Sequence, residues 1–246
     1  MTKTWENIER PPIVLAVMEV RFQPKSKFDV SFLKSNDSKL LEHYPKRSDN
    51  FSGNINLPAP NPGISTAQIS SQQVGYTYIN QDKTQKIAVT NEHIVFAMEG
   101  KYTGWEDFKR EGLFVLSNFK HILDISTIHR TSVRIINKLS LPSSNPPEDY
   151  FNTLITARKD TIEDTIDSYF IKYTQRIPEY SIRTNVIQSL EDIEDDNFNF
   201  IFDIDVLSHE VIDYNVETIE AILIKIREIK NSIFFKNLTD KTKQLL

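Results

Sequence analysis

The strongest constraint on the fold comes from residues 197–206, NFNFIFDIDV, in which apolar side chains recur at every second position. Successive side chains of a β-strand point to opposite faces of a sheet, so this stretch predicts a strand with one apolar face. That face comprises Phe198, Phe200, Phe202, Ile204 and Val206. The other face carries Asp203 and Asp205, whose Cβ atoms would lie about 6.6 Å apart. The segment is therefore expected to pack on a core through one face and to present carboxylates on the other.

Several other segments have the composition of strands, because they are rich in β-branched and apolar residues and end at turn residues. The predicted strands span 11–22, 67–80, 86–90, 93–99, 129–142, 167–177, 180–190 and 197–211. Helical patterns predict four helices. These span 29–44 with an interruption near Asn36, a segment that begins near Thr103, 145–158 and 216–238. Residues 52–66 are rich in proline, glycine and asparagine, which predicts a loop.

Two of the helix starts carry capping signals. Thr103 and Glu106 have the spacing of a capping box, in which each side chain satisfies a free backbone N–H. Asn215 precedes the last helix and is predicted to cap it. Within that helix, isoleucines recur at alternating spacings of three and four, at Ile219, Ile222, Ile226, Ile229 and Ile233. The spacing favours a face that packs on the sheet, and self-association into a homodimer is the alternative.

The order of the predicted elements is the same in both halves of the chain: a strand, a helix, three strands and a helix. This order predicts an α+β fold built from two similar β-α-β-β-β-α modules in tandem. Residues 1–125 would form the first module and residues 126–246 the second, in one compact unit. Each module would supply antiparallel strands with helices packed on one face.

Composition excludes several classes of protein. The 246 residues include only six glycines and no closely spaced run of them, so a phosphate-cradling loop is not expected. Cysteine is absent, which excludes disulfides and thiolate sites. The formal net charge of −5 disfavours a general nucleic-acid binder. The first residues are polar and the longest apolar runs are short, so we expect a cytoplasmic protein with no membrane segment and no cofactor.

Charged rows mark two of the predicted strands. Arg130, Arg134 and Lys138 project from one face of the strand at 129–142, whereas Asn137 falls on its apolar face and is expected to hydrogen-bond nearby backbone. The basic row is expected to pair with Asp203 and Asp205 across the sheet. Phosphates or an acidic partner are the alternative ligands. In the first strand, Glu19 and Arg21 likewise share one face. The seven charged residues of these rows are the candidate binding residues: Glu19, Arg21, Arg130, Arg134, Lys138, Asp203 and Asp205.

The two aspartates admit a second interpretation. Carboxylates on one face of a strand can share Mg²⁺ or Mn²⁺, which prefer oxygen ligands. Such a site would need a further ligand such as Glu19, Glu99 or His209, and none of these is fixed by local spacing. A half-solvated strand face, or ion pairs with arginine, explains the same residues and is favoured.

The motifs above resemble those of a sporadically distributed bacterial protein family of unknown function, whose members have about this length. The matching residues are Pro11, Pro12, Ile13 and Glu19, then Tyr102, Gly104, Trp105 and Phe108, then Arg134 and Asn137, then Asp203 to Val206, and a phenylalanine-rich end of the last helix. The chain departs from the family pattern at SVRIIN, where a glycine and an aromatic residue are more usual. The resemblance implies a bacterial, cytoplasmic protein, and the family's patchy distribution points to a mobile-element or phage-defence context.

Three functional hypotheses follow. The favoured one is a non-enzymatic binding or regulatory protein that presents the polar face of its sheet, or the loop at 52–66, to another protein. The second is a metal-dependent hydrolase or nuclease that uses Asp203 and Asp205 with Glu19. The third is nucleic-acid binding through Arg130, Arg134 and Lys138.

Overall fold

The structure, a computed structural model, describes residues 8, 11–24, 29–56, 68–153, 168–194 and 196–246. In this part of the chain, ten strands form a single sheet in which all neighbours are antiparallel. The strands are β1 (Ile13–Pro24), β2 (Lys46–Asn56), β3 (Gln68–Ile79), β4 (Gln85–Thr90), β5 (His93–Glu99), β6 (Ile125–Pro142), β7 (Tyr169–Ile177), β8 (Ile182–Glu194), β9 (Asn197–Ser208) and β10 (Ile212–Asp213). Their order across the sheet is β2-β3-β4-β5-β1-β6-β9-β8-β7, and β10 pairs with β6.

The described part of the chain contains five α-helices in addition to this sheet. They are α1 (Val30–Ser35), α2 (Ser38–His43), α3 (Trp105–Ile122), α4 (Val216–Asn237) and α5 (Asp240–Lys243), with 3₁₀ turns η1 (Pro147–Asp149) and η2 (Pro178–Tyr180). The predicted α+β class is confirmed. None of the described helices is long and apolar enough to cross a bilayer.

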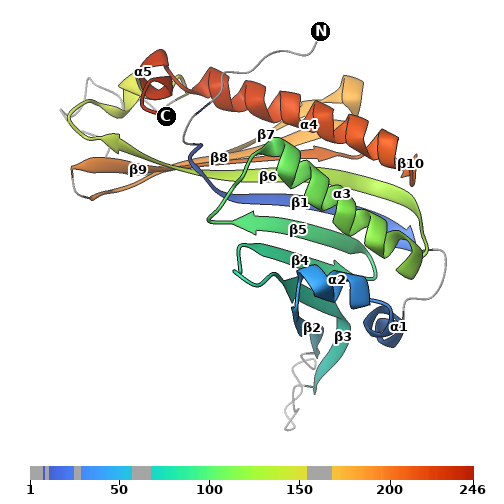
Figure 1. Cartoon of the computed structure of the whole chain (residues 1–246). Helices are drawn as coiled ribbons and strands as arrows, with labels where there is room; N and C mark the ends of the chain where they lie inside the picture. The colour runs from blue at the N-terminus through green and yellow to red at the C-terminus, as the bar shows by residue number, and fades with distance from the viewer. Residues whose placement is uncertain (1–7, 9–10, 25–28, 57–67, 154–167, 195) are drawn as a thin grey trace, which may run out of the picture.

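The middle of the sheet joins the two halves of the chain, because β1 pairs with β6 along most of its length (Figure 1). Strands β2 to β5 extend the sheet on the β1 side, and β9, β8 and β7 extend it on the β6 side. The alternation of β9 is confirmed in full, since its apolar stripe is buried from Phe198 to Val206. Asn137 is also buried as expected, and its side-chain amide donates to the Phe202 carbonyl at 2.9 Å.

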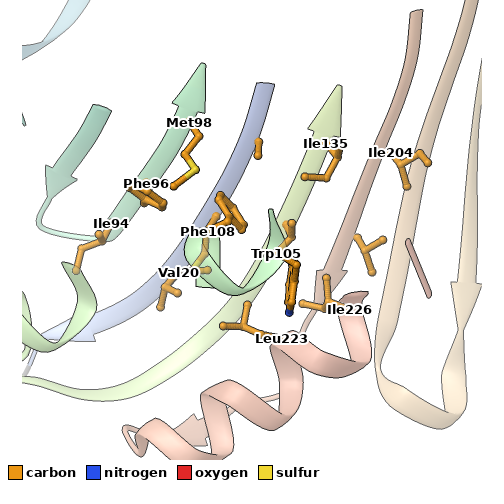
Figure 2. Close-up of a cluster of buried hydrophobic side chains, with 14 of the residues drawn as sticks. Val20, Ile94, Phe96, Met98, Trp105, Phe108, Ile135, Ile204, Leu223 and Ile226 are labelled. Carbon is orange, nitrogen blue, oxygen red and sulfur yellow. The ribbon is translucent and has the colours of Figure 1, made fainter. Parts of the chain in front are cut away.

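The hydrophobic core lies between the sheet and two long helices. Figure 1 shows α3 and α4 side by side on the same face of the sheet. In Figure 2, Trp105 and Phe108 of α3 and Leu223 and Ile226 of α4 point toward side chains of the central strands. Those strand residues are Val20, Ile94, Phe96, Met98, Ile135 and Ile204. Ile219 and Ile226 are fully buried, which confirms that the isoleucine seam of the last helix is its packing face.

The two short helices extend the same layer. The interruption predicted near Asn36 is confirmed, because α1 ends at Ser35 and α2 begins at Ser38. His43 of α2 packs edge-on against Phe114 of α3, with ring centroids 5.2 Å apart. Between the helices, the buried carboxylate of Asp37 accepts hydrogen bonds from Tyr78 Oη at 2.8 Å and Arg47 Nη1 at 2.5 Å. Burial and the Asp37 hydrogen bond raise the pKa of the Tyr78 hydroxyl well above its ordinary value.

The capping box predicted for the third helix is wrong. Gly104, not Thr103, is the N-cap of α3, and no side chain caps that end. Gly104 has a φ of 118°, a conformation that glycine adopts without a steric penalty. Glu106 instead forms ion pairs with Lys109 and Arg227. The cap predicted at Asn215 is confirmed, since its side chain accepts from the Thr218 N–H at 2.9 Å.

Two other segments differ from expectation. Residues 52–56 of the predicted loop belong to β2 and pair with β3, because a continuous ladder outweighs the turn propensity of their glycine and asparagines. The remainder of that loop lies outside the described residues. The helix predicted over 145–158 is a single 3₁₀ turn, η1, followed by an isolated bridge between Phe151 and Leu238. The end of that predicted helix, from 154, also lies outside the described residues.

Candidate functional site

The second face of the sheet, which we call the open face, bears none of the described helices (Figure 1). Its central positions are aliphatic, partly exposed, and separate from the core cluster. They are Leu15, Val17, Val95, Ala97, Ile136, Ile187 and Ile201. Leu207 lies on the same face and is buried, yet it too stands outside the core cluster. Strand alternation thus places a second apolar surface opposite the core, on a face that no described helix covers.

The candidate residues of β1 and β6 meet on this face. Arg21 Nε donates to Glu19 Oε1 at 2.8 Å, and Arg130 Nη2 forms an ion pair with Glu19 Oε2. Arg21 and Arg130 lie directly opposite each other on the paired strands. Glu19 therefore bridges two like charges that would otherwise repel each other across the ladder.

Arg134 and Asp203 form the best-defined contact of the site. Arg134 Nε donates to the two carboxylate oxygens of Asp203 at 2.9 and 3.1 Å, and its Nη2 donates to Oδ2 at 2.5 Å. The Asp203 side chain is almost fully buried, whereas that of Arg134 is about half exposed. The expected pairing across the sheet is confirmed for this pair. It does not extend to Arg130, which contacts Glu19, or to Lys138, whose exposed side chain joins no ion pair among the described residues.

Asp205 lies on the same face as Asp203 but has different partners. It is opposite Asn185 on β8, whose amide donates to Asp205 Oδ2 at 3.2 Å. Burial raises the pKa of Asp205 above its ordinary value, against the opposing effects of the Asn185 hydrogen bond and the nearby Arg134 charge. The carboxylate of Asp205 therefore carries a folding penalty at neutral pH. Burial has the corresponding effect on His93, opposite Arg21, and lowers its pKa.

Replacing Asp205 by asparagine is expected to raise the free energy of unfolding at neutral pH. A carboxyl group whose folded-state pKa is raised stabilises the fold below its unfolded pKa, and this contribution is lost as pH rises through the folded pKa. The contribution of Asp205 to stability should therefore fall as pH rises above about 3.8, the ordinary value, and Asp205→Asn should remove this part of the pH dependence. Urea denaturation of both proteins at a series of pH values measures the free energy of unfolding. The control is Asp49→Asn, which removes a carboxylate from an exposed position. A variant less stable than the wild type at neutral pH would contradict the assignment.

The structure also bears on the proposed metal ligands. In the described part of the chain, no three histidine, aspartate or glutamate side chains gather closely enough to hold a metal ion. Both oxygens of Asp203 accept hydrogen bonds from Arg134, so a cation there would have to displace a guanidinium. Glu19 contacts two arginines, and Glu99 forms an ion pair with Lys86.

Sequence reasoning overlooked three residues of this face. Asn185, Arg183 and Arg176 lie on β8 and β7, where alternation with buried Ile182, Val186 and their neighbours directs them to the open face. Both strands were expected, so the signal was present in their two-residue period. What the sequence lacked was the register that sets Arg176 opposite Arg183.

Comparison of the chain with protein-family models, with curated proteins and with solved structures found no match.

Proposed function

We propose that the protein is a non-enzymatic binding protein that docks a protein partner on the open face of its sheet. The observation that carries this proposal is the aliphatic row, the seven aliphatic side chains spread over β5, β1, β6, β9 and β8 that stand outside the core cluster. Contiguous apolar surface costs free energy in water, and it is typical of sites where another molecule binds.

The arrangement of charge supports a protein as the partner. Protein interfaces have an apolar centre and a polar rim, and charges at the centre are depleted or paired. On the open face, most charged residues directly opposite the aliphatic row are in ion pairs, namely Glu19, Lys86, Glu99, Arg134 and Asp203. Lys138, opposite Ile201, has no ion pair among the described residues, so the partner would have to supply a carboxylate to it. A protein surface of matching shape can therefore cover this centre without leaving an isolated charge buried.

We also propose that the sheet arose from two similar modules. In support, β1 is followed by helices α1 and α2 and later by β3, β4, β5 and α3, while β6 is followed by β7, β8, β9 and α4. The strands flank the central pair in mirrored order, as β3-β4-β5-β1 on one side and β6-β9-β8-β7 on the other. In this scheme β2 is an addition to the first module. Duplication would give the open face the length needed to bind an extended partner.

Site-directed cross-linking tests the proposed docking surface. Because the chain contains no cysteine, a benzophenone can be attached to a single cysteine introduced at Ile136, and the matched control carries it at exposed Lys34 on α1. After illumination in the cell of origin, a discrete adduct is expected from the Ile136 position alone. The captured protein is then purified and titrated calorimetrically into the wild type and into Ile187→Glu.

Ile187 stands outside the core, so the glutamate variant is expected to fold, which circular dichroism checks. A charge placed in the apolar centre of an interface should weaken binding by about tenfold or more. Equal adducts from the Ile136 and Lys34 positions, or wild-type affinity of Ile187→Glu, would refute docking on the open face.

A further inference from the structure

Two arginines face each other near the end of the sheet, on the hairpin formed by β7 and β8. The register sets Arg176 directly opposite Arg183, and both side chains project to the open face, since their neighbours Ile177 and Ile182 pack on the core. Directly opposed residues of antiparallel strands have Cβ atoms about 4.5–5.5 Å apart, and like charges at this spacing destabilise the pair. In the described part of the chain, no carboxylate forms an ion pair with either guanidinium.

The same face shows how the fold treats such a pair when it is purely structural. Arg21 and Arg130 are also directly opposed, but Glu19 contacts both of them and neutralises the repulsion. The residue opposite Arg183 on β9 is Leu207, which offers no acceptor. The repulsion between Arg176 and Arg183 is therefore retained, and an anion from outside the chain would relieve it.

The open face as a whole carries an excess of positive charge. Among the described residues, alternation places nine basic and six acidic side chains on it, although the whole chain has a net charge of −5. The basic ones are Arg21, Lys46, Lys86, Arg130, Arg134, Lys138, Lys172, Arg176 and Arg183. The acidic ones are Glu19, Glu99, Glu191, Asp203, Asp205 and Asp213. Glu99 and Asp203 neutralise Lys86 and Arg134, and Arg21 and Arg130 share Glu19, so the cations outside these ion pairs lie mainly on β6, β7 and β8.

We infer that Arg176 and Arg183 form an anion-binding site for carboxylates of an acidic segment of the partner protein. The inference rests on the proposed function and names the chemistry that the partner brings to this end of the open face. Guanidiniums on directly opposed strand positions can both donate N–H groups to the oxygens of one carboxylate or of two neighbouring ones. Ile187, which is partly exposed four residues along β8 from Arg183, would contact apolar side chains of the same segment.

Nucleic acid is the competing ligand, and the face is less suited to it. Binding of single strands relies on aromatic side chains on which bases stack, whereas Phe170 is the exposed large aromatic that β7 and β8 supply to this face. Binding of duplexes relies on a long track of free cations, whereas Arg21 of β1, Lys86 of β4 and Arg130 of β6 are already paired with carboxylates. A short acidic protein segment needs only a few free cations, and its apolar side chains can pack on the aliphatic residues of this face.

The test measures binding of a fluorescently labelled oligoglutamate peptide to the full chain by anisotropy, with a labelled oligothymidylate of the same charge as the second probe. The double variant Arg176→Gln/Arg183→Gln is expected to bind the peptide about tenfold or more weakly, because two charge-assisted contacts are lost. The control, Lys34→Gln/Lys236→Gln, removes the same charge from exposed positions on α1 and α4 and is expected to bind as the wild type does. The arginine variant should also be at least as stable as the wild type in urea, because it relieves a repulsion; a merely structural pair would be destabilised.

An equal loss of peptide affinity in both double variants, or no peptide binding by the wild type, would overturn the inference. Tighter binding of the oligothymidylate, lost in the arginine variant, would assign the pair to nucleic acid and overturn it as well. If Ile187→Glu weakens binding of the captured protein but Arg176→Gln/Arg183→Gln does not, docking on the open face is supported and only the anion site is refuted.

Discussion

Replacing Phe200 by alanine is expected to lower the free energy of unfolding by about 3–5 kcal/mol. Phe200 lies in the first half of β9 and is fully buried. Its ring centroid is 4.5 Å from that of Phe151 and 6.4 Å from that of Tyr169, so the truncation leaves a cavity between β9 and the segments that pack on it. Because those neighbours are themselves held by the sheet, the cavity cannot collapse fully. Urea denaturation of the purified variant measures the loss.

The matched control is Phe170→Ala. Phe170 lies on the open face of β7 and is 65% exposed, so its truncation should change the free energy of unfolding by no more than about 0.5 kcal/mol. The two variants remove the same side chain from opposite faces of one sheet. Similar losses in both would mean that the open face is packed against something in the isolated chain, and would contradict the one-sided core.

Replacing Gly75 by alanine is expected to destabilise the fold by about 3 kcal/mol or more, because the added methyl group would overlap backbone atoms of the neighbouring strand. A Cβ atom at Gly75 would lie 1.8 Å from the carbonyl oxygen of Val89 and 2.8 Å from its carbonyl carbon. These are backbone atoms of β4, which pairs with β3 at this point, so relief requires the two strands to separate. Gly75 also lies where the register of β2 against β3 shifts. Thermal unfolding followed by circular dichroism measures the effect.

Gly100→Ala provides the comparison. Gly100 has a φ of 74°, and a Cβ atom there would meet no atom within 4 Å. Its substitution should therefore cost only the backbone strain, about 1–2 kcal/mol. The fall in melting temperature should thus be clearly larger for Gly75→Ala. A smaller fall than for Gly100→Ala would show that β3 and β4 are not in the register described.

Local patterns in the sequence predict the elements and their faces well, because both depend on neighbouring residues. The two-residue period of 197–206 predicted β9 and its buried stripe, and the isoleucine spacing predicted the packing face of α4. The start of α3 was misjudged for a physical reason: a glycine with positive φ can begin a helix without any side-chain cap. The beginning of the predicted loop was misjudged because pairing with β3, a non-local interaction, decides the conformation of residues 52–56.

The candidate site was only partly predictable, because it depends on which strands are neighbours. Asp203 and Arg134 were expected to meet, since a basic and an acidic strand face attract each other in a sheet. The bridge from Glu19 to Arg130 was not foreseen, because the pairing of β1 with β6 joins residues more than a hundred positions apart. The opposed arginines of β7 and β8 depend on the hairpin register, which a shift of one residue would change.

Thiol labelling of single cysteines tests the open face most directly. Ile135 and Val186 point into the core and are fully buried, whereas the next residues, Ile136 and Ile187, point to the open face. In the folded, isolated protein, cysteines at 136 and 187 are expected to react with a maleimide, and those at 135 and 186 only after unfolding. With the captured partner bound, the cysteines at 136 and 187 should become protected. If all four are protected in the isolated protein, or if those at 136 and 187 stay reactive in the complex, the open face is not the docking surface.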